Sequence, residues 1–160
     1  MREYLVRMIY VEMLGVEFGH GHIHAVNLAH EKSLMEKRVG YLAVSLCLHA
    51  GHELMLLLIN TIQQDLRSDN FLEVSMALIV VGRLVNAETL PALLPLVIKA
   101  LEHAQANVRK KAISCLHRFL AIDPTCLSNL SDKVKKALCD RDPSVMGASL
   151  PLLVEVCHFI

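Results

Sequence analysis

The chain contains no tryptophan, and its aromatic residues make up only 4% of 160 positions. Burial must therefore rely on aliphatic side chains, which are abundant in a sequence that is 54% hydrophobic. Leucine, alanine and methionine favour helices, and no segment sustains the alternation of apolar and polar residues that marks a half-buried strand. The composition excludes a disordered chain and predicts an all-α protein.

The sequence also lacks net charge, paired cysteines and long apolar runs. Sixteen basic residues balance sixteen acidic ones, so no overall field attracts nucleic acid or an anionic membrane. The five cysteines are widely spaced and form no CxxC pair, which argues against a disulfide framework or zinc ribbon and indicates a reducing cytosol. No apolar run approaches the roughly 18 residues that span a bilayer, and the first residues, MREYLVRMIYVEML, do not read as a signal peptide. We therefore expect a soluble chain that contacts membranes only peripherally.

Helix-capping and helix-breaking residues divide the chain into about nine expected helices, most of them roughly 11 to 17 residues long. Capping signals mark three helix starts, at Ser33 with Glu36, at Asn70 with Glu73 and at Asp142 before Pro143. The predicted breaks fall near Gly15, His30, Gly51, Ser68, Asn86, Ala104, Pro124 and Asp140. Short turns would join successive helices.

An apolar pattern recurs along the chain. It appears as Val39, Ala43 and Cys47; as Leu72, Met76 and Val80; as Val108, Ala112 and Leu116; and as Val145, Ser149 and Leu153. The first members lie 33, 36 and 37 residues apart, and one further expected helix separates each pair of neighbours. A two-helix repeat of this length predicts an α-solenoid of HEAT/armadillo-like helix pairs, in which each unit buries its apolar stripe against the next.

Six segments together resemble the N-terminal trunk of the adaptin large subunits. They are YVEMLG (10–15), IHAVNL (23–28), EKRVGYLAVSL (36–46), LLINTIQQDLRSDN (57–70), VRKKA (108–112) and ALCDRDPSVMGASL (137–150). The resemblance covers nearly the whole chain. Within the family, EKRVGYLAVSL and CDRDPSVMGASL are most similar to the epsilon branch, the large subunits of the fourth heterotetrameric adaptor complex.

The resemblance implies a non-enzymatic scaffold in a vesicle coat of the clathrin-adaptor type. Its implied partners are the small sigma, medium mu and beta subunits and an Arf-type GTPase, and its place is the cytoplasmic side of trans-Golgi network and endosomal membranes, where cargo is sorted. Nucleic acid is not an expected partner. Family trunks are several times longer than this chain, so we expect residues 1–160 to be a single partial trunk domain with an apolar stripe at its end.

Four histidines between His20 and His30 raise the question of a metal site. On a continuous helix His20 and His24 would lie one turn apart and His22 would point away, which leaves too few ligands for a closed zinc site. Adaptins usually carry an aromatic or polar residue after Phe-Gly, where this chain has His20-Gly21-His22, so the departure concerns local packing. We expect surface or helix-capping histidines, no metal and no cofactor; pH sensing stays open.

Catalytic motifs are missing from the sequence. It has no glycine-rich phosphate loop, HExxH or GxSxG, and DRD at 140–142 is interpreted as a helix-cap turn. Cys115 and Cys139 have no basic partner at catalytic spacing, so packing is the simpler role and a helical hydrolase a remote alternative. The main alternative to an adaptor is a HEAT-repeat transport receptor or phosphatase-type scaffold. Such a protein would show an acidic or asparagine-lined peptide groove, which this sequence does not.

The clearest charged feature consists of six basic residues: Arg109, Lys110, Lys111, Lys133, Lys135 and Lys136. If their helices lie side by side, they form one patch for an acidic subunit, a GTPase or anionic headgroups, where each cation contributes on the order of 1 kcal/mol. A solvated helix face is the alternative and the commoner case. Alpha adaptins contact phosphoinositides through basic residues of the first trunk helix, but here that helix offers only Arg2 and Arg7, separated by Glu3.

Overall fold

A computed structural model describes residues 1–16, 19–127 and 131–158. These residues form nine α-helices and two short 3₁₀ helices and contain no strand, which confirms the predicted all-α fold. Every predicted break falls in a segment that joins two successive α-helices. The chain folds as two compact units, Met1–Asp65 and Leu66–Ile160. That residues 1–160 act as a single partial domain stays a prediction.

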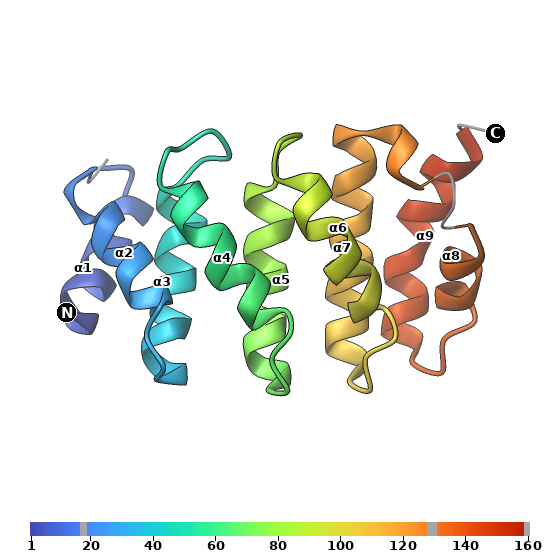
Figure 1. Cartoon of the computed structure of the whole chain (residues 1–160), viewed down its shortest axis with the longest axis horizontal. Helices are drawn as coiled ribbons and strands as arrows, with labels where there is room; N and C mark the ends of the chain where they lie inside the picture. Colours follow the sequence, from blue (N-terminus) through green and yellow to red (C-terminus); the bar gives the residue numbers. More distant parts are fainter. Residues whose placement is uncertain (17–18, 128–130, 159–160) are drawn as a thin grey trace. The chain divides into compact units, whose positions relative to one another are not determined.

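The first unit is a bundle centred on α3. Its elements are α1 (Arg2–Met13), η1 (Gly19–Gly21), α2 (His22–Ala29), α3 (Leu34–Cys47) and α4 (Met55–Asp65). Helix α3 packs against both α1 and α2, and α4 packs against α2 (Figure 1). The core contains fully buried aliphatic side chains, among them Leu5, Val26, Val44, Leu58 and Ile62. Burial in this unit is therefore mainly aliphatic, as the composition predicts, with Tyr41 as a buried aromatic residue.

Helices α2 and α3 approach each other closely at Gly40. A Cβ atom added there would lie 2.3 Å from the backbone nitrogen of Ala29 and 2.6 Å from the carbonyl carbon of Leu28. Backbone atoms cannot move aside as a flexible side chain can, so only glycine fits this crossing. The glycine of EKRVGYLAVSL is therefore a packing residue.

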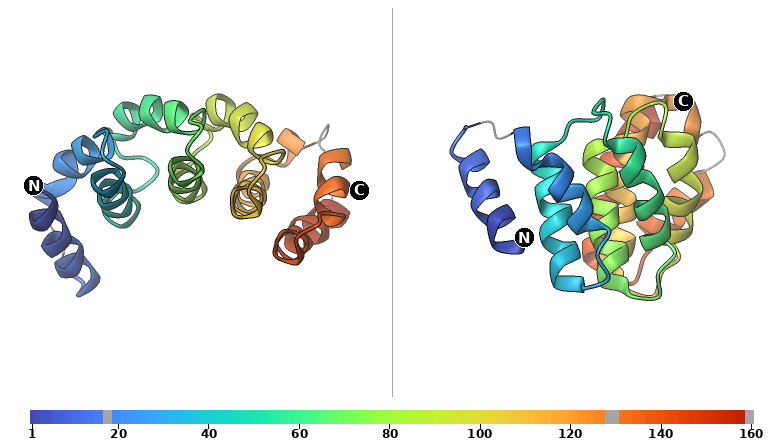
Figure 2. Two further views of the ribbon diagram at one scale, coloured as in Figure 1. Left: turned by 90° about the horizontal axis from the view of Figure 1, so that it is seen from below. Right: turned by 60° about the vertical axis from the view of Figure 1, so that its left-hand side comes forward.

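The second unit consists of two layers of helices. Its elements are α5 (Phe71–Leu84), α6 (Leu90–Ala100), α7 (Ala106–Ile122), η2 (Pro124–Leu127), α8 (Ser131–Leu138) and α9 (Pro143–His158). Helices α5, α7 and α9 form one layer, in which α7 contacts both neighbours. Helix α6 packs against α7 and α8 against α9, on one side of that layer (Figure 2). Phe119, Leu116 and Ile113 of α7 lie at the centre of the core.

The repeat is present, but its register differs from the prediction. Counted from the residues that precede α3, α5, α7 and α9, the seventh positions are small and buried: Gly40, Ala77, Ala112 and Ser149. The tenth positions, Ala43, Val80, Cys115 and Leu152, are buried as well. In the prediction, Val108 and Val145 share the third position, but Val39 lies at the sixth and Leu72 at the second. Leu72 is 43% exposed, so the patterns that begin at Val39 and Leu72 are misaligned.

The capping signals have mixed outcomes. The Asn70 side chain accepts from the Leu72 backbone N–H at 3.1 Å, and the Asp142 carboxylate accepts from that of Ser144 at 2.8 Å, as predicted. Ser33 precedes α3 but forms no side-chain cap hydrogen bond, so the capping box with Glu36 is absent. Among the described helices none is long and apolar enough to cross a membrane.

Candidate functional site

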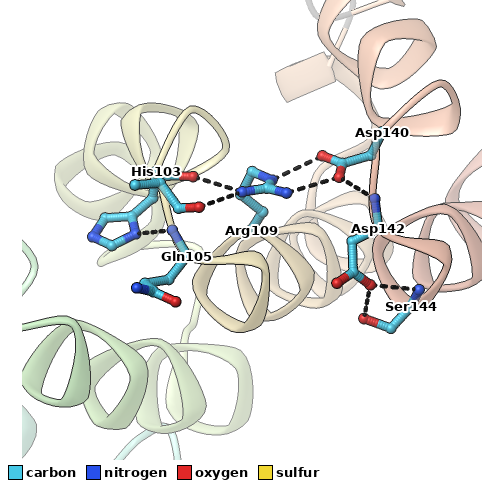
Figure 3. Close-up of polar contacts among 7 residues, drawn as sticks. His103, Gln105, Arg109, Asp140, Asp142 and Ser144 are labelled. Carbon is cyan, nitrogen blue, oxygen red and sulfur yellow. Dashed lines mark hydrogen bonds and ion pairs between the residues drawn. The ribbon is translucent and has the colours of Figure 1, made fainter.

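Arg109, the first residue of the predicted basic patch, is engaged in a structural network (Figure 3). Its Nε and Nη2 donate to the two carboxylate oxygens of Asp140, each at 2.8 Å. Its Nη1 donates to the carbonyl oxygens of His103 and Ala104, each at 2.9 Å. Only 16% of the Arg109 side chain is exposed. The guanidinium therefore connects the turn before α7 with the turn before α9, and little of it is left for a ligand.

Asp140 and Asp142 shape the turn that Arg109 holds. Asp140 also accepts from the backbone N–H of Asp142 at 2.9 Å, and Asp142 accepts from the Ser144 hydroxyl at 2.6 Å. The hydrogen bond from Arg109 lowers the pKa of the Asp140 carboxyl, and the hydrogen bonds from Ser144 lower the pKa of Asp142. The DRDPS segment is thus the helix-cap turn that the sequence predicts, and its Asp140 carboxylate also holds the Arg109 side chain in place.

The lysines of α8 lie beside acidic residues. Lys133 pairs with Glu102 at 3.4 Å, and Lys135 pairs with Asp132 one turn earlier at 3.6 Å. Both pairs are exposed and contribute at most about 1 kcal/mol each. A small cleft brings Lys133 and Lys136 next to Arg109, but Glu102 and Asp140 line it too. This neutralised cleft, as we call it, therefore carries little net positive charge.

The structure does not gather all six basic residues at one place. Arg109, Lys133 and Lys136 line the neutralised cleft, whereas Lys111 lines a different groove between α5 and α7. Lys110 is exposed on α7 and Lys135 on α8, and neither lines either cavity. Binding of a partner or membrane by the six-residue patch stays a prediction.

The second cavity, which we call the α5–α7 groove, has a volume of about 460 Å³. It is lined by Leu78, Ile79, Gly82 and Arg83 of α5 and by Lys111, Ser114 and Cys115 of α7. Gly82 allows the close approach at its floor, since a Cβ atom there would lie 3.3 Å from the Cys115 sulfur. The Cys115 thiol donates to the carbonyl oxygen of Leu78 at 3.0 Å. Burial raises its pKa to about 12, so the thiol is held as a packing and hydrogen-bonding group.

Two cations of the α5–α7 groove have no acidic partner in the described part of the chain. Arg83 is exposed and Lys111 is half-buried, and neither forms an ion pair there. Burial lowers the pKa of Lys111, since its ammonium loses water without gaining a carboxylate. Sequence reasoning missed Arg83 because a single arginine near a helix end carries no local signal. Aligning the starts of α5 and α7 would have placed it on the same face as Lys111.

In the first unit, Asp65 links α4 to α3. Its carboxylate accepts from the Lys37 ammonium at 2.6 Å and from the Tyr41 hydroxyl at 2.5 Å. Asp65 is 3% and Lys37 8% exposed. All three residues lie in the segments that resemble adaptins. Their network is structural, because the buried Asp65 charge is paired with Lys37 inside the unit.

His20 and His24 do not lie one turn apart on a single helix. His20 lies in η1 and α2 begins only at His22, so His20 and His24 are not successive turns of one helix. The His22 ring instead meets the His52 ring at 5.2 Å between centroids, and His52 meets His49 at 5.4 Å. Within residues 1–16, 19–127 and 131–158, no group of three or more histidine, cysteine, aspartate and glutamate side chains is arranged to hold a metal.

Packed pairs of amphipathic helices, repeated along the chain, define the class of this protein as an α-solenoid of the HEAT/armadillo kind. The family model "Adaptin N terminal region" matches residues 1–158. The chain therefore belongs to the adaptin N-terminal family.

Comparisons with individual proteins agree with this membership. The chain is 51% identical over 98% of its length to AP-4 complex subunit epsilon of Arabidopsis thaliana, and 50% identical over 98% to AP-4 complex subunit epsilon-1 of Homo sapiens. It spans 17% and 14% of those relatives. Among structures, a homology model of the full-length AP-3 complex in an intermediate open conformation matches with a TM-score of 0.78 at 26% identity, over 92% of this chain and 26% of that one.

Proposed function

We propose that this chain serves as part of a non-enzymatic scaffold subunit, of the epsilon type, in a vesicle-coat adaptor complex. The observation that carries the proposal is the identity of about half of all positions to AP-4 epsilon subunits across 98% of the chain. In the α5–α7 groove the Cys115 thiol is buried with a raised pKa, which disfavours it as a nucleophile. The proposed role of the chain is therefore to present surfaces to partner proteins.

The fold suits this role physically. A solenoid builds its core between successive helix pairs and leaves the outer surface of each layer for partners. The proposed partners are the sigma, mu and beta subunits, and an Arf-type GTPase that recruits the coat to trans-Golgi network and endosomal membranes. Lys110 and Lys136, which are exposed and form no ion pair within the described residues, supply the remaining positive charge for an acidic subunit or anionic headgroups.

Co-expression with small subunits tests the proposal. The chain is expressed with the sigma subunit of the fourth adaptor complex, and in parallel with the sigma subunits of the other complexes, followed by pull-down through a tag on the chain. Selective recovery of the fourth sigma subunit is expected. Equal recovery of every sigma subunit would remove the epsilon assignment, and recovery of none would remove the proposed scaffold role of this segment.

A further inference from the structure

The α5–α7 groove carries positive charge that the protein does not neutralise itself. Helix α7 contains no acidic residue at all. The one acidic residue of α5, Glu73, accepts a hydrogen bond from the Ser68 hydroxyl at 2.6 Å and does not line the groove. Arg83 and Lys111 thus stand at an apolar recess with no carboxylate beside them.

The recess between the two cations is apolar. Ile79, a large aliphatic side chain in the second half of α5, is 49% exposed. Leu78, Gly82 and Cys115 form the adjoining surface. Burying such a surface against a second aliphatic side chain is favourable by the hydrophobic effect. The groove therefore combines an apolar centre with cationic flanks.

The two cations lie at opposite ends of the groove. Arg83 is thirteen residues beyond Asn70, the N-cap of α5, and Lys111 is six residues beyond Gln105, the N-cap of α7. The two helices are in register, because Cys115 on α7 touches Leu78 and Gly82 on α5. A seven-residue difference corresponds to about 10 Å along the helix axes, at about 1.5 Å per residue; because the two cations lie on neighbouring helices, they are also offset sideways, by up to the interaxial distance of about 8–10 Å. Ile79 and Ser114 lie between these ends.

We propose that the α5–α7 groove is a docking site for an amphipathic helix of a partner protein, which places two carboxylates two helical turns apart on Arg83 and Lys111 and an aliphatic side chain between them on Ile79. Seven residues of helix span about the same 10 Å. The partner's first carboxylate would also give the half-buried Lys111 ammonium the counter-charge that it lacks within the chain.

A helix fits this surface better than an extended peptide does. Most of the groove is lined by residues inside α5 and α7, whose backbone N–H and C=O groups are bonded within their helices; only Gly82 and Arg83, in the last turn of α5, have carbonyl groups outside this pattern. An extended peptide would therefore find few main-chain partners there, whereas a helix satisfies its own backbone. A membrane surface is disfavoured because the groove offers only two cations, Arg83 and Lys111, with apolar residues beside them, and not a broad cluster of basic residues.

A designed peptide tests the site directly. The probe is a fluorescein-labelled, alanine-based helix of about 18 residues, long enough to be helical in water, with two glutamates seven positions apart and a leucine midway. Its matched controls replace the leucine by serine or both glutamates by glutamine. Fluorescence anisotropy against the full chain should show saturable binding of the probe and much weaker binding of both controls.

Protein variants locate the binding. The double variant Arg83→Gln/Lys111→Gln should weaken probe binding about tenfold, because two charge-assisted contacts are lost. The control double variant Arg118→Gln/Arg141→Gln makes the same charge change at exposed positions outside the groove, and should weaken binding less than about twofold. Circular dichroism confirms that each variant is folded.

Several results would overturn the proposal. Equal weakening by the two double variants would reveal a diffuse attraction to positive charge, and a serine peptide that binds as well as the leucine peptide would remove the apolar part. No saturable binding up to millimolar probe would reject the site. Binding of phosphatidylserine vesicles that depends on Arg83 and Lys111, without peptide binding, would assign the surface to a membrane. No adaptor subunit enters this experiment, so it and the scaffold proposal can fail separately.

Discussion

Arg109 and Lys111 are separated by one residue on α7, yet they belong to two regions of opposite character. In the neutralised cleft, Arg109 is held by Asp140 and two carbonyl oxygens. In the α5–α7 groove, Lys111 meets an apolar floor and a second cation but no carboxylate. The formal charges of a RKK segment are therefore a poor guide to its field. What decides the field is which acidic residue the next repeat places opposite each cation.

The comparison predicts that removing a cation destabilises the protein according to its burial and pairing. Lys37 is the most deeply buried of the paired cations described above. Lys37→Met should lower the free energy of unfolding by about 3 kcal/mol. The substitution leaves the buried Asp65 carboxylate with the Tyr41 hydroxyl as its remaining side-chain donor. Urea denaturation measures this change. The control Arg38→Met removes an exposed cation of the same helix and should change stability by less than about 0.5 kcal/mol. Equal effects of the two variants would contradict the claim that burial and pairing of a cation decide the cost of its removal.

Arg109→Ala against Lys111→Ala is the direct test of the two regions. Arg109→Ala should cost about 2–3 kcal/mol, since it breaks four charge-assisted hydrogen bonds and leaves Asp140 without its partner. Lys111→Ala should cost less than about 0.5 kcal/mol, because no partner is left behind. Thermal and urea unfolding of both variants provide the values. A cost for Lys111→Ala as large as that for Arg109→Ala would abolish the distinction.

The pH dependence of stability should separate the regions as well. The pKa of Asp140 is lowered in the folded protein, so its contribution is fully present above the unfolded pKa of about 3.9 and is lost as the pH falls below that value. Wild-type protein should therefore lose stability between about pH 4 and 2 more steeply than Asp140→Asn, which starts less stable. Urea midpoints measured across this range give the two slopes. Parallel slopes would show that Arg109 does not favour the ionised Asp140.

The smallest expected effect concerns the floor of the groove. Gly82→Ala should gain helix propensity but compress the contact with the Cys115 sulfur, for a net change within about 0.5 kcal/mol. Gly147→Ala, in α9 with open space around it, should stabilise by about 0.5–1 kcal/mol. Thermal unfolding compares the two. If Gly82→Ala stabilises as much as Gly147→Ala, the floor of the groove is not tightly packed.

Much of the fold follows from local signals in the sequence. Asn70 and Asp142 cap their helices as their types and positions predict, because these interactions join residues close in the chain. The register of the repeat could not be predicted from these signals, because leucine and valine occupy exposed as well as buried positions. Leu72 fits the apolar spacing but faces solvent. The small residues Gly40, Ala77, Ala112 and Ser149 mark the register better, because only small side chains fit where helices cross.

The candidate site was less accessible to sequence reasoning. The Arg109–Asp140 pair joins residues that are 31 positions apart, and the network at Asp65 reaches back 24 and 28 positions. A basic run looks the same in the sequence whether its partners are present or missing. Arg83 and Lys111 became a pair only when α5 and α7 lay side by side in register.

The Arg109 network has a consequence for how the second unit comes apart. A helix pair of a solenoid is held mainly by contacts with the pairs beside it, so that a pair can open locally. The guanidinium of α7 clamps the turn that precedes α9, so opening of α8 and α9 must break that clamp along with their apolar contacts. Backbone amides of α9 should then exchange their hydrogens together with those of α7, as one cooperative block. Without the Arg109 side chain, the α8–α9 pair should open separately.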